Sequence, residues 1–252
     1  NKFIEVGYQD YAQYRSDPSK EASSQLSPYF HSGQISTHEV FDKISELESW
    51  SPESINPKMV GRREGWWGSS DNFESFMDEL ITWRELGYHT CVRRANYNQY
   101  SSLPEWAIKT LHEHSSDERE YIYSLDELTY SQTHDEIWNA AQNQLRTQGV
   151  IQNYLRMLWG KKILEWTPNP QIALSYMITL NDRYSLDGRD PNSYSGVFWI
   201  LGRYDRAWGP ERNIFGKIRY MTSDSTARKF NLKPYLEQWG NESLDVSTSI
   251  LK

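Results

Sequence analysis

Apolar side chains recur every three or four positions through most of this chain, which is the spacing that lines one face of an α-helix. The segment 71–88 is the clearest case: Asp71 is its expected N-cap, and its apolar face comprises Phe73, Phe76, Leu80, Trp83 and Leu86. Thr37 is the expected cap of a second helix. Strand-like alternation is scarce, so the sequence predicts an all-α fold with helices at 37–49, 71–88, 104–114, 134–148, 150–166, 168–182 and 191–202.

Turn residues separate these helices without dividing the chain into domains. Breaks are expected near Gly149, Pro168 and Gly188. The stretch 50–70 is rich in Pro and Gly and reads as a long loop packed by its own tryptophans. No repeat, low-complexity tract or convincing linker is present, so we expect one all-helical domain over residues 1–252, with a core from about 11 to 235.

The amino-acid composition argues against several kinds of site and partner. One cysteine, Cys91, excludes an internal disulfide framework and a cysteine-based zinc site. No apolar run reaches the roughly 18 residues of a membrane span, so no membrane partner is expected. Metal ligands are not expected either, because His112 and His114 flank Glu113 at a spacing that does not share a helix face. These features favour a reducing, soluble, intracellular setting.

Charge is distributed unevenly along the chain. The formal net charge is −7, which argues against coating nucleic acid non-specifically. The window 201–233, however, holds eight basic and three acidic side chains, a net charge of +5. An acidic body with one basic segment suits a local anionic partner, and a chance surface cluster is the alternative.

Three further features have both a structural and a functional interpretation. Trp159 and Trp166 are seven residues apart on one expected helix and Trp138 lies on the preceding one, so these tryptophans form either ordinary core or a relay for single electrons. The serine-rich stretch 23–36 suits a phosphate, with Arg84 as a second contact. The segment "SLDGRDPNSYSG", residues 185–196, is either a solvated loop or a charged site between two aromatic segments.

Several long motifs in this order resemble the DNA photolyase/cryptochrome family, specifically its class II cyclobutane-pyrimidine-dimer photolyases. The resemblance runs from about Tyr11 to Tyr235. Its strongest stretches are "LSPYFHSGQIS", "FMDELITWREL", "IYSLDELTYSQTHDEIWNAAQ", "LRMLWGKKILEW", "LNDRYSLDGRDPNSYSGVFW" and "DRAWGPERNIFGKIRYM". It implies the all-helical FAD-binding domain of that family, without the N-terminal α/β antenna domain.

The resemblance also implies residue roles. Arg156 and Asp187 would pair beside the flavin, and Asn181 or Asn192 would lie near its N5 atom. Trp138, Trp159 and Trp166 would relay electrons. The full implied FAD-binding set is Tyr11, Ser23, Ser24, Leu26, Ser27, Arg84, Asn153, Arg156, Asn181, Asp187, Asp190 and Asn192.

The implied activity is repair of cyclobutane pyrimidine dimers by electron transfer from light-excited, fully reduced FAD. Glu79, Trp83, Met157 and Trp199 would line the pocket for the flipped dimer, Glu79 as its hydrogen-bond partner. Arg206, Trp208 and Arg219 would contact DNA. A cryptochrome-like blue-light receptor without repair activity is the alternative, and a helical scaffold without cofactor is a third.

Partners and setting follow from the same resemblance. We expect UV-damaged DNA as the partner, together with an antenna domain or separate subunit, because no antenna chromophore is expected on this chain. The expected location is the cytoplasm, at the nucleoid in a bacterium, or the nucleus in a eukaryote. The sequence also departs from the class II pattern: Gln152 and Asn153 precede Tyr154, and the segment before Asp205 is one residue short. These departures put the lesion preference in doubt.

Overall fold

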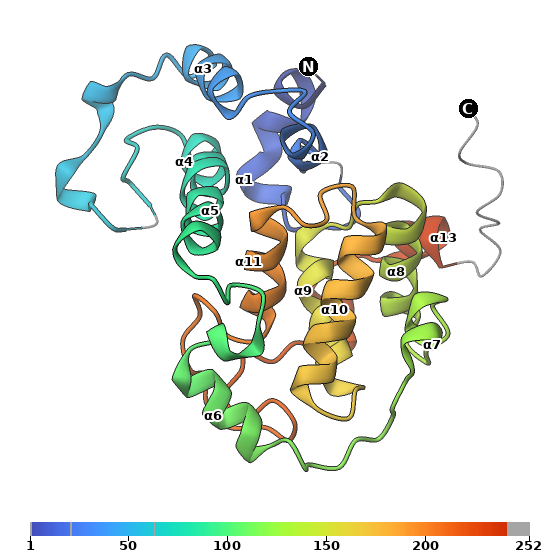
Figure 1. Ribbon diagram of the computed structural model, residues 1–252. Coiled ribbons are helices and arrows are strands. Elements are labelled where there is room, and N and C mark those ends of the chain that lie inside the picture. Colours follow the sequence, from blue (N-terminus) through green and yellow to red (C-terminus); the bar gives the residue numbers. More distant parts are fainter. Residues whose placement is uncertain (1, 21, 63, 241–252) are drawn as a thin grey trace. The chain divides into compact units, whose positions relative to one another are not determined.

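A computed structural model describes residues 2–20, 22–62 and 64–240 and divides the chain into two compact units, with the boundary between His89 and Thr90 (Figure 1). Helices and turns make up the regular structure, and the described residues contain no strand beyond one isolated bridge between Arg212 and Gly216. The all-α prediction is confirmed. The assignment of residues 1–252 to one domain stays a prediction.

The first unit is built on short helices around an aromatic core. Phe3 and Phe76 are in ring contact with each other, and each of them contacts Tyr8 and Tyr11, at centroid distances of 5.2–6.4 Å. The elements are η1 (Phe3–Gly7), η2 (Tyr8–Asp10), α1 (Tyr11–Tyr14), α2 (Ser27–His31), α3 (Thr37–Leu47), η3 (Pro52–Ser54), η4 (Pro57–Met59), α4 (Asp71–Met77), η5 (Asp78–Trp83) and α5 (Arg84–Arg93), which crosses the boundary.

Both expected helix caps are wrong by one residue. The Ser36 hydroxyl accepts from the Glu39 amide at 3.0 Å, so Thr37 is already helical. The Ser70 hydroxyl accepts from the Phe73 amide at 3.2 Å and takes the role expected of Asp71. In both places the serine directly precedes another capping type, and spacing alone does not separate the two.

The predicted helix 71–88 contains a π-helical segment, η5, between α4 and α5. A π-turn holds one residue more than an α-turn, so it rotates everything after it. Phe73, Phe76 and Leu80 are buried as expected, whereas Leu86 is 37% exposed. The predicted continuous apolar face therefore ends at the π-segment.

The loop 50–70 is packed by its own tryptophans, as predicted. Trp50 stacks on Phe73 at 5.3 Å and meets Trp67 at 5.7 Å. The Trp50 indole N–H also donates to the carbonyl of Trp67 at 2.7 Å. These contacts join both ends of the loop to helix α4.

Helix α9 lies at the centre of the second unit and packs against α8, α10 and α11 (Figure 1). Most of its residues are buried, because neighbours cover it on several sides. The elements of this unit are η6 (Tyr100–Ser102), α6 (Glu105–Glu113), α7 (Leu125–Thr129), α8 (Glu136–Gln148), α9 (Asn153–Glu165), α10 (Pro170–Tyr184), α11 (Pro191–Ile200), α12 (Ser223–Lys229) and α13 (Lys233–Trp239).

Gly149 ends helix α8, which confirms the expected break. Its φ of +70° is left-handed, and its amide donates to the Leu145 carbonyl at 3.0 Å. A Cβ at this position would lie 2.4 Å from Leu186 Cγ. Glycine is therefore required both for the backbone angle and for the approach of the segment after α10.

Candidate functional site

The predicted site residues occur in both units, and each group is described within its own unit. The first unit holds Tyr11, Ser23, Ser24, Leu26, Ser27, Glu79, Trp83 and Arg84. The second holds Trp138, Asn153, Arg156, Met157, Trp159, Trp166, Asn181, Asp187, Asp190, Asn192, Trp199, Arg206, Trp208 and Arg219.

A pocket of about 470 Å³ in the first unit is lined by three of the predicted FAD-binding residues, Ser23, Ser24 and Leu26. Gln25 and Gln34 also line it, so hydroxyl and amide groups face the space. Such donors suit phosphate and ribityl oxygens. Tyr11, Ser27 and Arg84 are not among its lining residues.

Arg84 and Tyr11 make other contacts. Arg84 donates to Glu85 at 2.9 Å and stacks over the Tyr88 ring at 4.3 Å. Burial raises the pKa of Tyr11 to about 12, and the nearby charge of Glu79 adds to the effect. Tyr11 is therefore a neutral hydroxyl at ordinary pH.

Glu79 lies on η5 and forms an ion pair with Arg15 at 2.6 Å. The Arg15 guanidinium lies 5.7 Å from the Tyr11 ring centroid. Burial opposes the charge on Arg15, but Glu79 and Tyr11 raise its pKa overall. On the same π-segment the Trp83 indole donates to Asp78 at 3.0 Å. The π-segment thus carries two of the predicted dimer-pocket residues.

In the second unit Arg156 donates to the side-chain oxygen of Asn181 at 2.7 Å, and Asn181 is only 3% exposed. Asp187 accepts from the Ser185 hydroxyl. The predicted Arg156–Asp187 ion pair stays a prediction. Arg156 on α9 and Asn181 on α10, both in the predicted FAD-binding set, are in direct contact.

The charged segment 185–196 is a turn followed by the first residues of α11. Asp190 is the N-cap of α11 and accepts from both the amide and the side chain of Asn192, at 2.9 and 3.0 Å. Pro191 follows at the first helical position, where its missing N–H costs nothing. Asp190, one of the charged residues predicted to belong to the site, therefore caps a helix. Asn153, by contrast, is the exposed first residue of α9.

Three tryptophans form a buried cluster around α8 and α9. Trp138, Trp159 and Trp166 are 0%, 2% and 2% exposed. The rings of Trp138 and Trp166 meet edge-to-face at 5.6 Å, and the Trp138 indole donates to the Trp159 carbonyl at 3.0 Å. The Trp159 indole donates to Gln142 at 2.8 Å. All three predicted relay residues are thus within one compact, water-poor cluster.

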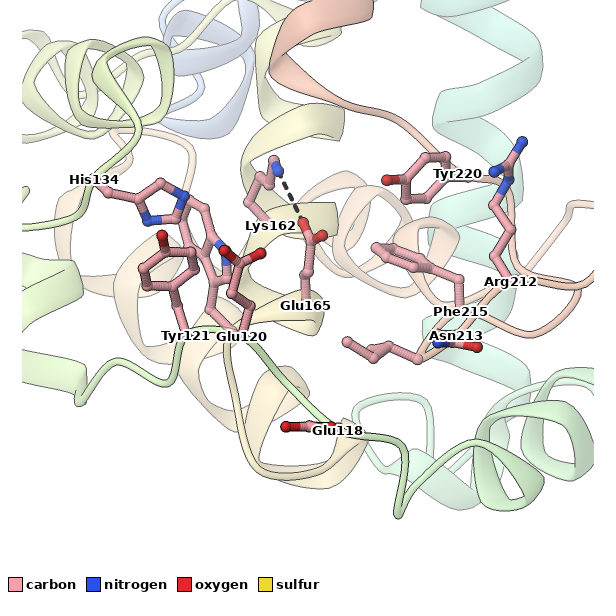
Figure 2. A pocket seen from close by; sticks show the side chains of 12 residues that line it. Glu118, Glu120, Tyr121, His134, Lys162, Glu165, Arg212, Asn213, Phe215 and Tyr220 are labelled. Atoms are coloured by element: carbon pink, nitrogen blue, oxygen red, sulfur yellow. Dashed lines mark ion pairs between the residues drawn. The ribbon is translucent and has the colours of Figure 1, made fainter.

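Trp166 also borders a pocket of about 380 Å³ that sequence reasoning missed (Figure 2). His134 packs against Trp166 at 5.3 Å and against Tyr121 at 3.8 Å. The Tyr123 hydroxyl lies 2.7 Å from His134 Nδ1. Lys162 and Glu165 form an ion pair with an Nζ–Oε2 distance of 2.9 Å, marked by the dashed line in Figure 2. Aromatic rings therefore extend from the buried cluster to Tyr121, which is 39% exposed.

The predicted DNA-contacting residues form an alternating stack of cations and rings, which we call the cation–aromatic ladder. Arg206 lies 4.4 Å from the Trp208 ring centroid. Arg219 lies 4.1 Å from Trp208 and 5.0 Å from Trp199. The Lys161 ammonium also lies 5.4 Å from the Trp199 ring centroid. The ladder joins the DNA group of predicted residues to a dimer-pocket tryptophan.

Asp205 holds the ladder together, although the sequence did not single it out. Its carboxylate accepts from Arg219 Nε at 3.1 Å, from the Trp208 indole at 3.1 Å and from the Arg206 amide at 2.9 Å. Burial opposes the charge, but these hydrogen bonds lower the pKa of Asp205. The motif "DRAWGPERNIFGKIRYM" contains Asp205 and is the only sequence signal for it.

Metal ligation has no support in the part of the chain that the structure describes, where no group of three or more His, Cys, Asp or Glu side chains is arranged to hold an ion. Within the same residues, no helix combines the length and the apolar character needed to cross a membrane.

Comparison with known proteins gave related sequences. A deoxyribodipyrimidine photo-lyase from Methanothermobacter thermautotrophicus is 42% identical over 94% of this chain and 48% of its own length. Proteins of the same name from Potorous tridactylus and Arabidopsis thaliana are each 40% identical, over 88% and 93% of this chain and 38% and 44% of theirs. The chain therefore spans less than half the length of these relatives. Comparison with protein-family models gave no match.

A solved structure shares the fold. A bacterial class III photolyase from Agrobacterium tumefaciens superposes with a TM-score of 0.65, over 94% of this chain and 42% of that one, at 17% identity. At this identity the likeness shows the fold alone.

Proposed function

We propose that this chain is the FAD-binding part of an enzyme that uses light to repair cyclobutane pyrimidine dimers in UV-damaged DNA. The reason is that the chain belongs, over nearly its whole length, to the deoxyribodipyrimidine photo-lyase family. The observation that carries the repair function is the cation–aromatic ladder, which joins Trp199 of the expected dimer pocket to Arg206, Trp208 and Arg219. A light receptor needs no such surface.

The chain's residues fit FAD. Ser23, Ser24 and Gln25 offer hydroxyl and amide donors in one pocket for the phosphates and ribityl chain. Arg156, held by buried Asn181, offers a cation for the ring end. When bound and fully reduced, FAD supplies on excitation by light the electron that opens the cyclobutane ring. Tyr11, Leu26, Ser27, Arg84, Asn153, Asp187, Asp190 and Asn192 complete the proposed FAD-binding set.

The buried tryptophans relay single electrons inward from the surface. Trp138 and Trp166 are in ring contact, and Trp138 touches the backbone of Trp159 through its indole N–H. Trp166 borders the pocket of Figure 2 and contacts His134, which stacks on Tyr121; Tyr121 is 39% exposed and is the ring that a reductant from solution reaches. Burial keeps water from the two inner rings, so charge passing through them is not trapped by solvent reorganisation.

The residues proposed to contact the dimer are one charged acceptor, Glu79, and three apolar or aromatic side chains. The Glu79 carboxylate is paired with Arg15 at 2.6 Å, and it accepts a hydrogen bond from a pyrimidine N–H of the dimer. Trp83, Met157 and Trp199 supply apolar surface for the flipped dimer. Because a dimer is already poorly stacked, it costs less to flip than normal bases do. Arg206 and Trp208 occupy the gap left in the duplex, and Arg219 supports Trp208.

The remaining parts of the proposal concern subclass, partners and location. The class II assignment rests on motif resemblance. An antenna domain or a separate subunit is proposed as a second partner beside damaged DNA. The protein is proposed to act where DNA is, in the bacterial cytoplasm at the nucleoid or in a eukaryotic nucleus.

Binding to damaged DNA tests this function against the receptor alternative. Fluorescence anisotropy compares a labelled duplex carrying one thymine dimer with the same duplex undamaged, using the FAD-loaded chain in the dark. The repair function predicts clearly tighter binding of the dimer duplex. Equal affinity for both duplexes, with a flavin that is still reduced by blue light, would favour the cryptochrome-like receptor instead.

A further inference from the structure

Two consecutive lysines of α9, Lys161 and Lys162, are buried, and their ammonium groups contact different kinds of partner. Lys162 is 9% exposed and lies near Glu165 and Asp135, at 2.9 and 4.0 Å. Lys161 is 0% exposed, donates to the backbone carbonyl of Ile200 and lies beside the Trp199 ring. The ammonium of Lys161 is therefore directed at the end of α11 rather than at a carboxylate pair.

The end of α11 suits a cation. The last carbonyls of a helix have no partner within it, and together they carry a partial negative charge. Ile200 is the last residue of α11, so the bond from Lys161 satisfies one of these carbonyls. The ring of Trp199, one residue earlier, presents its electron-rich face to the same ammonium. One side chain thus holds both the backbone and the aromatic ring at this helix end.

Gly160 makes the contact possible. A Cβ at Gly160 would lie 2.1 Å from the Ile200 Cδ1 atom and 3.0 Å from Met177 Sδ. The glycine therefore permits the close packing of α9 on α11 at the residue next to Lys161. The pair Gly160–Lys161 brings α11 near and then binds its end.

This arrangement is costly for stability, which argues for a role beyond packing. Burial lowers the pKa of Lys161 to about 7, with Asp205 opposing the shift and Arg219 adding to it. A methionine of similar shape would fill the same space without any desolvation cost. Buried titratable groups with strongly shifted pKa values concentrate at functional sites.

We propose that Lys161 is a positioning residue of the dimer pocket: it sets the place of Trp199 against Arg219 by holding the end of α11. The proposal rests on the proposed function. Lys161 touches neither the dimer nor the cofactor in this account, and it acts through Trp199.

The test is Lys161→Met in the full 252-residue chain, with Lys162→Met as the matched control on the same helix. The readout is the ratio of affinities for dimer-containing and undamaged duplex. We expect Lys161→Met to lower this ratio about tenfold, the binding equivalent of one charge-assisted hydrogen bond. Photoreduction of bound FAD by blue light stays at the parent rate, a result that general unfolding would not give. Lys162→Met keeps the parent ratio.

A double-mutant cycle shows whether the effect passes through Trp199. In a Trp199→Phe background, Lys161→Met should change the ratio little further. If Lys161→Met is insoluble, Lys161→Gln replaces it and should lower the ratio in the same direction. A parent-like ratio in a folded Lys161 variant, or full additivity with Trp199→Phe, overturns the inference. A parent chain that does not prefer dimer duplex overturns the proposed function itself, whatever the variants do.

Discussion

Asp205 offers a sharp test of the cation–aromatic ladder, because Asp205→Asn removes its charge and changes little else. The Oδ1 atom accepts from the Trp208 indole, from the Arg206 amide and, at 3.4 Å, from Arg219 Nη2, and an asparagine oxygen can keep these three bonds. The Oδ2 atom accepts from Arg219 Nε at 3.1 Å, and there asparagine would present an N–H to another N–H. One charge-assisted hydrogen bond is therefore lost, and two donors are left facing each other.

The expected loss of stability follows from these changes in hydrogen bonding. A hydrogen bond to a charged group contributes about 1.5–3 kcal/mol, and Arg219 is partly exposed, which reduces the figure. We expect the free energy of unfolding to fall by about 2 kcal/mol and the Tm by about 4–8 °C. Thermal unfolding followed by circular dichroism at pH 7 measures it. Affinity for dimer duplex should fall as well, since Arg219 supports both Trp199 and Trp208.

The pH dependence of this difference is a second part of the prediction. The pKa of Asp205 is lower in the folded chain than the ordinary 3.8, so its contribution is complete above that value and is lost as pH falls through the folded pKa. The gap in stability between parent and variant should therefore shrink at acid pH. Glu237→Gln is the control: its pair with Lys233 is 3.9 Å long and exposed, and its loss should cost less than about 0.5 kcal/mol. Equal Tm values for parent and Asp205→Asn at pH 7 would refute the reasoning.

Three further predictions concern the dimer pocket, the relay and the buried lysine. Glu79→Ala should retain FAD and lose most of its repair rate, because no carboxylate then faces the dimer; repair at the parent rate in a single-turnover assay would remove Glu79 from the mechanism. Trp166→Phe should slow flavin photoreduction under blue light, measured by visible absorption, while dark binding of dimer duplex is unchanged; parent-rate photoreduction would exclude Trp166 from the relay. Lys161 binds its proton less tightly in the folded chain than in the unfolded one, so the free energy of unfolding of the parent should rise by roughly 2–3 kcal/mol from pH 7 to pH 9 as the buried lysine loses its proton, and Lys161→Met should lack this rise; parallel denaturant-unfolding profiles for parent and variant across that range would contradict it.

Local patterns in the sequence predicted most of the helices, and tertiary contacts account for what they missed. Periodicity located α3, α6, α8, α9, α10 and α11 to within a few residues, because each buries a face or is covered by neighbours. It did not predict η5, since a π-turn changes the phase by one residue and leaves the local composition unchanged. It also did not predict α12 or α13, which are seven residues each.

The candidate site was predicted unevenly for the same reason. The three buried tryptophans and the residues Arg206, Trp208 and Arg219 stand out by type and motif. Lys161 and Asp205 do not, because a lysine or an aspartate is ordinarily a solvated surface group, and only the fold shows that these two are buried against a helix end and among donors. Long-range contacts of this kind carry no local signal.

The most direct test of the central claim is light-dependent loss of dimers. The FAD-loaded, fully reduced chain is mixed with an oligonucleotide carrying one thymine dimer, and the products are separated by chromatography after blue light and after an equal time in the dark. Our account predicts that the repaired oligonucleotide, with the dimer split, appears only in the illuminated sample, and that it appears more slowly with Glu79→Ala. A reduced, DNA-bound flavoprotein that leaves the dimer unchanged under light would contradict it.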